Sequence, residues 1–154
     1  MKAFVTVILL AFLTGCASTT GFNSYQGLEL SPAQASQLTG DAVGRIEANY
    51  PPAKTLIVLD QAKGLFGSEL EAELRAKGYA VEIQQEKKTE DKASGAVVSG
   101  TTALRYEVKP YGAEYVLLVV QGADGFQINR VYKKGAGELQ AKTGITEIKA
   151  AAHE

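Results

Sequence analysis

Cysteine, histidine and tryptophan are almost or wholly missing from this chain of 154 residues. It has one cysteine, Cys16, one histidine, His153, and no tryptophan. A lone cysteine excludes an internal disulfide, so a folded domain here depends on its hydrophobic core. A single histidine beside the last residue excludes a histidine-rich zinc site and is poorly placed to act as a catalytic base. We therefore expect no metal, no cofactor and no catalytic residue, and we do not expect an enzyme.

Net charge and long apolar runs are also scarce. The 16 basic and 17 acidic residues leave a net charge of −1, whereas nucleic-acid-binding proteins normally carry a basic stripe or face. We expect no nucleic-acid partner. After the first 15 residues, the longest apolar run, 115–120, has the length of a strand and falls far short of the roughly 20 residues that span a bilayer. The glycine patterns that bind phosphates in nucleotide-binding proteins are absent.

The N-terminus has the pattern of a secretory signal peptide. Lys2 supplies a positive charge, residues 3–13 form a short apolar region, and small residues precede Cys16. The segment Leu13-Thr14-Gly15-Cys16 resembles the lipobox of bacterial lipoproteins, in which the thiol is lipidated and the chain is cleaved just before it. The resemblance implies a signal peptide over residues 1–15 and a mature chain held in a membrane by acyl chains, such as palmitate, on Cys16. The alternative is a buried thiol after a conventional cleavage site.

The residues after Cys16 indicate where the protein is located and how the domain is linked to its anchor. Ala17 stands where an aspartate would, in many enteric bacteria, signal retention in the inner membrane. By resemblance to that sorting pattern, we expect the periplasmic face of the outer membrane. Residues 16–31 are mostly small and polar and predict a flexible stalk. The alternative is that the isolated hydrophobic residues of this segment order on a partner.

The first half of the expected domain, residues 32–149, predicts an α-β-α-β unit. Ser31-Pro32 suits the start of a helix, and apolar residues recur at spacing four up to Ile46, although Gly40 is expected to break the helix. The apolar run 55–59 predicts a central strand that is buried on both faces. A second amphipathic helix over 66–78 and an alternating strand over 79–84 follow, so two parallel strands joined by a helix are expected.

The second half predicts an antiparallel meander. Residues 85–102 form a polar connection without a clear period, which we expect to be a mobile loop. Strands are predicted over 103–110, 114–121 and 126–133, with glycine-containing turns between them. Residues 150–154 are expected to fray. The predicted fold class is therefore α+β, a small two-layer domain with an α-β-α-β unit followed by a β-meander.

Two arginine–tyrosine pairs on predicted strands are candidate partner contacts. They are Arg105 with Tyr106, and Arg130 with Tyr132. Arginine and tyrosine are enriched at the energetic centres of protein interfaces. The alternative is that the tyrosines pack in the core while the arginines lie on the opposite, wet face. Glycan hydrolysis by a pair of carboxylates would need only Asp or Glu residues. The acids between 69 and 73, however, lie on the solvated side of the predicted helix, which its amphipathic pattern already explains.

Several segments of the expected domain occur in an order that is informative. The segments are Asp41-Ala42-Val43, Tyr50-Pro51-Pro52-Ala53-Lys54-Thr55, Phe66-Gly67-Ser68-Glu69-Leu70, Leu74-Arg75-Ala76-Lys77-Gly78-Tyr79-Ala80-Val81, Leu104-Arg105-Tyr106-Glu107-Val108 and Arg130-Val131-Tyr132. In this order they resemble the TrbH family of small lipoproteins of conjugative transfer loci. The resemblance implies a structural or accessory role in a conjugative type IV secretion system, with contacts to its other envelope subunits and no catalytic residues. An oligomer within a larger complex is compatible with that role. The alternative is a free-standing envelope lipoprotein that binds a small ligand or glycan.

Overall fold

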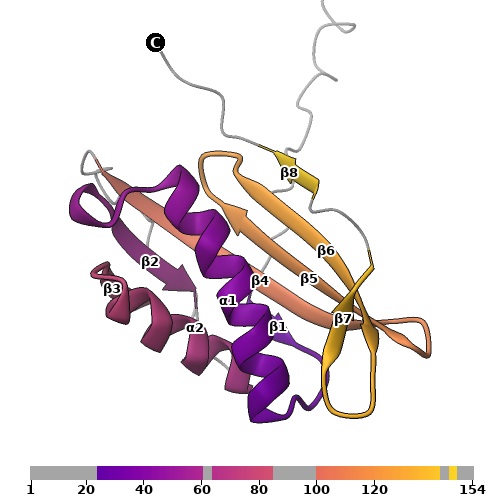
Figure 1. Ribbon diagram of the computed structural model, residues 1–154. Coiled ribbons are helices and arrows are strands. Elements are labelled where there is room, and N and C mark those ends of the chain that lie inside the picture. Colours follow the sequence, from indigo (N-terminus) through magenta and orange to yellow (C-terminus); the bar gives the residue numbers. More distant parts are fainter. Residues whose placement is uncertain (1–23, 61–63, 85–99, 143–145, 149–154) are drawn as a thin grey trace, which may run out of the picture.

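A computed structural model shows two helices packed on one face of a mixed sheet (Figure 1). The expected signal peptide, Cys16, nearly all of the 85–102 loop and the tail at 150–154 lie outside the described residues. Within the described part, no helix is long and apolar enough to cross a membrane. The structure describes residues 24–60, 64–84, 100–142 and 146–148.

The first helix, α1, runs without interruption over Pro32–Asn49. Its start is a capping box, because the Ser31 side chain accepts from the Gln34 backbone and the Gln34 side chain accepts from the Ser31 backbone. The expected break at Gly40 is wrong. Gly40 lies on the exposed side of the helix, and the buried stripe on the other side holds the helix on the sheet despite the weak local propensity of glycine.

The expected parallel unit is confirmed. Strand β2 (Leu56–Asp60), helix α2 (Gly64–Ala76) and strand β3 (Ala80–Gln84) follow one another, and β2 and β3 pair in parallel. A short 3-10 turn, η2 (Pro52–Lys54), precedes β2. The expectation that β2 is buried on both faces is wrong. Its burial alternates, with Ile57 and Leu59 fully buried, because the helices cover only one side of the sheet.

The meander is also confirmed. Strands β4 (Thr101–Tyr111), β5 (Tyr115–Gly122) and β6 (Gln127–Lys134) pair antiparallel in sequence order. The first of them, β4, starts two residues before the expected position, inside the segment predicted as a loop, because its N-terminal half pairs in parallel with β2. The described sheet therefore joins the two predicted halves of the domain through the β2–β4 pair.

Three short strands complete the sheet. Strand β1 (Tyr25–Gln26) pairs in parallel with β4 beside the end of β2, while β7 (Leu139–Ala141) and β8 (Thr146–Ile148) pair antiparallel with β6. The order of the main path is β3-β2-β4-β5-β6-β7. This arrangement is the predicted two-layer α+β fold.

Residues 24–30, which we expected to belong to the flexible stalk, instead lie against the domain. The Ser24 N–H donates to the Asp60 carboxylate at 3.2 Å, and the Ser24 hydroxyl accepts from the Tyr106 N–H at 3.3 Å. Leu28 and Leu30 pack against the hydrophobic core. Full burial of one leucine is worth about 1.5–3 kcal/mol, so the partial burial of these two favours docking of the segment over the stalk that its small, polar composition suggested.

Candidate interaction surface

Both described helices pack on one face of the sheet; the other face carries no helix of the described residues, and we call it the open face. Side chains alternate along a strand, so the buried Leu104, Tyr106 and Val108 point to the helices and their neighbours in β4 point away. The strand register extends this assignment across the sheet. The open-face side chains of strands β2, β4, β5 and β6 are Leu56, Val58, Asp60, Thr101, Ala103, Arg105, Glu107, Lys109, Tyr111, Tyr115, Leu117, Val119, Gln121, Gln127, Asn129, Val131 and Lys133.

The exposed large hydrophobic residues of the described structure all belong to this face. Register places Tyr25 beside Glu107, Tyr111 beside Tyr115, and Ile148 beside Gln127. Tyr25, Tyr111 and Ile148 are each at least half exposed, and Tyr115 is 36% exposed. Ile148 lies at the opposite end of the face from Tyr111 and Tyr115, and Leu117, Val119 and Val131 lie between these ends. Apolar side chains that extend across one face in this way are a candidate interaction site.

The lysines and arginine of the open face are matched by acids at short range. Lys109 Nζ lies 2.8 Å from Glu107, Lys133 Nζ lies 3.6 Å from Glu114 and Arg105 Nε lies 3.9 Å from Asp60. These ion pairs are at least partly exposed to solvent, which screens their contribution to stability. Their effect is to leave the open face without a strong net charge of either sign.

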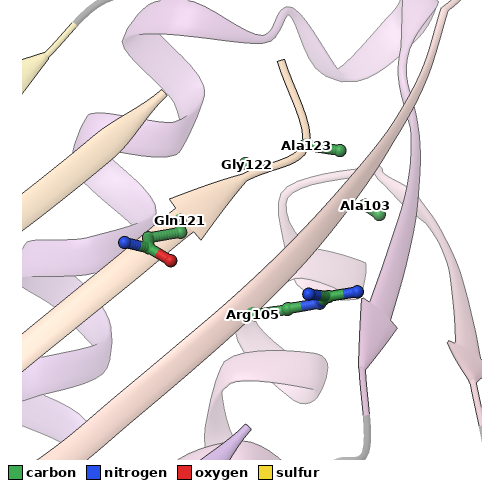
Figure 2. A pocket seen from close by; sticks show the side chains of 5 residues that line it. All are labelled: Ala103, Arg105, Gln121, Gly122 and Ala123. Carbon is green, nitrogen blue, oxygen red and sulfur yellow. The ribbon is translucent and has the colours of Figure 1, made fainter. Parts of the chain in front are cut away.

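A hollow of about 280 Å³ lies at one end of the open face, between β4 and the end of β5, whose lining side chains are drawn in Figure 2. Arg105 is its one charged lining residue, beside Ala103, Gln121, Gly122 and Ala123. Sites for small molecules are usually concave, largely apolar and about 300–1,000 Å³ in volume. This hollow is smaller, and it is one part of a broad surface.

The first predicted contact pair is divided between the two faces of the sheet. Arg105 lies on the open face and lines the hollow, whereas Tyr106 is fully buried under the helices. The Tyr106 ring meets the Phe66 ring of α2 edge-on, with 5.0 Å between the ring centres. Tyr106 therefore has no surface to offer a partner, and the alternative of a core tyrosine with a solvent-facing arginine describes this pair.

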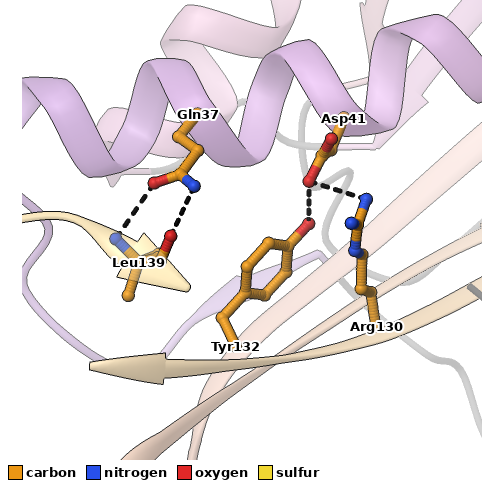
Figure 3. A network of polar contacts seen from close by, with 5 residues as sticks. All are labelled: Gln37, Asp41, Arg130, Tyr132 and Leu139. Carbon is orange, nitrogen blue, oxygen red and sulfur yellow. Dashed lines mark hydrogen bonds and ion pairs between the residues drawn. The ribbon is translucent and has the colours of Figure 1, made fainter. Parts of the chain in front are cut away.

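The second predicted pair lies together on the helix side. Tyr132 is fully buried, and its hydroxyl donates to Asp41 of α1 at 2.7 Å (Figure 3). Arg130 Nη1 lies 2.8 Å from the same carboxylate, and its guanidinium carbon lies 5.4 Å from the centre of the Tyr132 ring. Neither of the two alternatives foresaw this arrangement. The three side chains hold the middle of α1 on β6, so Tyr132 is a packing residue with no exposed surface.

A second contact from α1 closes the outer edge of β7 (Figure 3). The Gln37 side chain accepts from the Leu139 N–H at 3.0 Å and donates to the Leu139 carbonyl. Leu139 pairs with Lys134 at a position where its own backbone groups point away from β6. The carboxamide of Gln37 thus takes the place of a neighbouring strand. Sequence reasoning missed Gln37, because a glutamine on a helix carries no signal of such a contact.

The tyrosine of this network should make stability depend on alkaline pH. Burial, the hydrogen bond to Asp41 and the charge of that carboxylate raise the pKa of the Tyr132 hydroxyl well above its ordinary value near 10. The unfolded chain ionises first, so the stabilisation is complete below about pH 10 and is lost as pH rises further. We expect Tyr132→Phe to reduce the fall in unfolding free energy above pH 10 by up to about 1.4 kcal/mol per pH unit.

Denaturant titrations of the wild type and of Tyr132→Phe between pH 8 and pH 12 measure this difference. At pH 8, the variant should lose only about 1 kcal/mol, the worth of one hydrogen bond. Identical alkaline slopes in the two proteins would contradict the assignment.

The fold and the open face define a two-layer α+β domain whose exposed apolar residues are gathered on the uncovered side of its sheet. The family model described as Conjugal transfer protein TrbH matches residues 17–149, and the chain belongs to this TrbH family. No curated protein and no solved structure matches the chain.

Proposed function

We propose that this protein is an outer-membrane lipoprotein that serves as a structural or accessory component of a conjugative type IV secretion system. Membership of the TrbH family is the observation that carries the link to conjugal transfer. The lipobox-like segment ending at Cys16 supports a lipid anchor, and Ala17 supports the outer membrane as its location. The proposed role is assembly through protein contacts, without catalysis.

The docked N-terminal segment would keep the domain close to the membrane. Ser24 is tied to Asp60 and β4, so only eight peptide units separate Cys16 from the domain. A chain of that length spans at most about 28 Å. The domain would therefore meet subunits that lie next to the membrane, whereas a long stalk would allow a much wider reach.

The open face is the surface best suited to those contacts. It carries the exposed tyrosines and Ile148, and tyrosine is enriched in protein interfaces. The buried Tyr106 and Tyr132 are not part of it, so Arg105 is the candidate contact from the sequence that lies on this face. The alternative role in binding a small ligand or glycan has less support, because the hollow beside Arg105 has a volume just below the usual range of ligand sites and has a single charged side chain in its lining.

Deletion of the gene tests the proposed function. We expect plasmid transfer from the deletion strain to fall to near background and to return when the wild-type gene is supplied separately. We also expect affinity-tagged protein, solubilised from the membranes of transferring cells, to co-purify with other secretion subunits. Unchanged transfer, together with the absence of such subunits, would contradict the proposal.

A further inference from the structure

We propose that the open face is the interface between two copies of this chain, packed sheet against sheet. This inference goes beyond the proposed function and does not depend on it. It rests on three features of the described structure: side chains and the N-terminal segment occupy part of the backbone edges of β3, β4 and β7, the open face is apolar at its centre and free of strong net charge, and its area approaches that of a standard interface.

Strand addition at the sheet edges is blocked at several points. Gln37 occupies both outward backbone groups of Leu139 in β7. At the other end of the main path, the Arg75 guanidinium donates to the Val81 carbonyl of β3 at 2.7 Å. Side chains that cover an edge in this way are a known protection against edge-to-edge pairing. These contacts favour association through a face over association through an edge.

The edge of β4 beyond β2 is closed by other means. Its Tyr106 N–H is used by Ser24, and its Val108 carbonyl accepts from the Gly27 N–H at 2.8 Å. Pro110, the next residue that faces this edge, has no N–H to offer. No described helix or strand lies over the open face (Figure 1), and Leu117 and Val131 at its centre are partly exposed, whereas Val119 is only 7% exposed.

The centre of the open face is apolar and its rim is aromatic. Leu117 pairs across strands with Val131, and Val119 lies one alternation further along β5. Exposed tyrosines flank this centre, beside the ion pairs of Lys109 and Lys133. An apolar centre with a polar and aromatic rim is the usual anatomy of a protein interface.

The charges of the face suit a second copy better than a strongly charged partner. In a two-fold symmetric dimer the same patch meets itself, so any net charge would repel its own copy. Here each of the three cations has an acid within 4 Å on the same face or at its rim. Two open faces can therefore meet without like-charge repulsion, while they offer no net charge to attract an oppositely charged surface.

The area of the open face is close to the area that each partner buries in a standard protein interface. Five neighbouring strands spaced about 4.8 Å apart set the width of the open face, and eight residues with a rise of about 3.4 Å each set its length. The flat area of the face is therefore roughly 650 Å². A standard interface buries about 800 Å² on each partner, and rim side chains such as Tyr25 and Tyr115 add to the flat estimate. Two twisted sheets that pack in this way form a sandwich with about 10 Å between the layers.

Cysteine crosslinking in the full-length, membrane-associated chain tests the dimer. Leu117→Cys and Val131→Cys each place a thiol at the centre of the open face, and Ala48→Cys places one on the exposed side of α1 as the matched control. The wild type reports any background from Cys16. After treatment with a short bismaleimide, we expect a dimer band for both open-face variants and none above background for Ala48→Cys.

A charged substitution sharpens the test. Adding Leu117→Glu to the Val131→Cys variant should reduce the dimer band by about tenfold or more, because the carboxylate would be buried without a partner. Expression in cells without the other transfer genes separates this inference from the proposed function. Open-face crosslinking no stronger than that of Ala48→Cys, or an adduct whose size requires a different protein, would overturn the dimer.

Discussion

Replacing Tyr106 with alanine should lower the free energy of unfolding by about 3–5 kcal/mol, the range for a large aromatic side chain removed from a core. Tyr106 is fully buried in the longest strand of the sheet, and its ring packs edge-on against Phe66 of α2. The substitution would leave a cavity between the central strand and the second helix. Denaturant unfolding of the two proteins, followed by circular dichroism, measures the loss.

The same substitution on the other side of the sheet is the matched control. Tyr25 is 54% exposed on the open face, so Tyr25→Ala should cost less than about 1 kcal/mol. The contrast follows from which face each tyrosine occupies. Equal losses for the two variants would contradict the assignment of Tyr106 to the core and of Tyr25 to the surface.

Much of the fold follows from local patterns in the sequence. The spacing of apolar residues up to Ile46 and the Ser31-Pro32 start predict α1, and alternation predicts the three strands of the meander. The second helix and its parallel strands were found in the same way. These elements are predictable because each has one buried side. Apolar residues then recur about every 3.6 residues in a helix and every two residues in a strand.

The features that were missed depend on contacts between distant residues. Ser24 meets Asp60 and Tyr106 across 36 and 82 residues of chain, and no local pattern in the 16–31 segment announces either contact. The Asp41–Tyr132 hydrogen bond spans 91 residues. The contacts of residues 24–30 and of the Arg130–Tyr132 pair could not be predicted from local patterns for this reason.

The candidate surface required the fold before it could be recognised. Alternation separates Arg105 from Tyr106, but it does not say which of the two sides the helices cover. The same alternation puts Arg130 and Tyr132 on one side, and that side is the one under α1. Only the strand register shows that Tyr25, Tyr115 and the other exposed hydrophobic residues lie on the same face of the sheet.

The second large effect concerns Cys16. Under the proposed function, acyl chains on its thiol hold the protein in the membrane, each buried methylene contributing about 0.8 kcal/mol. A serine hydroxyl does not replace the thiol as the lipidated group, so Cys16→Ser removes the anchor and leaves the domain, whose described residues begin at Ser24, unchanged. We expect the protein to move from the membrane fraction to the soluble fraction.

The most direct measurement is made in the gene-deletion strain, supplied with either the wild type or Cys16→Ser, by comparing membrane fractionation and plasmid transfer in the same cells. Ser18→Ala, two residues away, is the control and should behave as the wild type. Our account of a membrane-anchored transfer component predicts that Cys16→Ser loses both membrane association and the ability to restore transfer. A Cys16→Ser protein that sediments with membranes and restores transfer would contradict it.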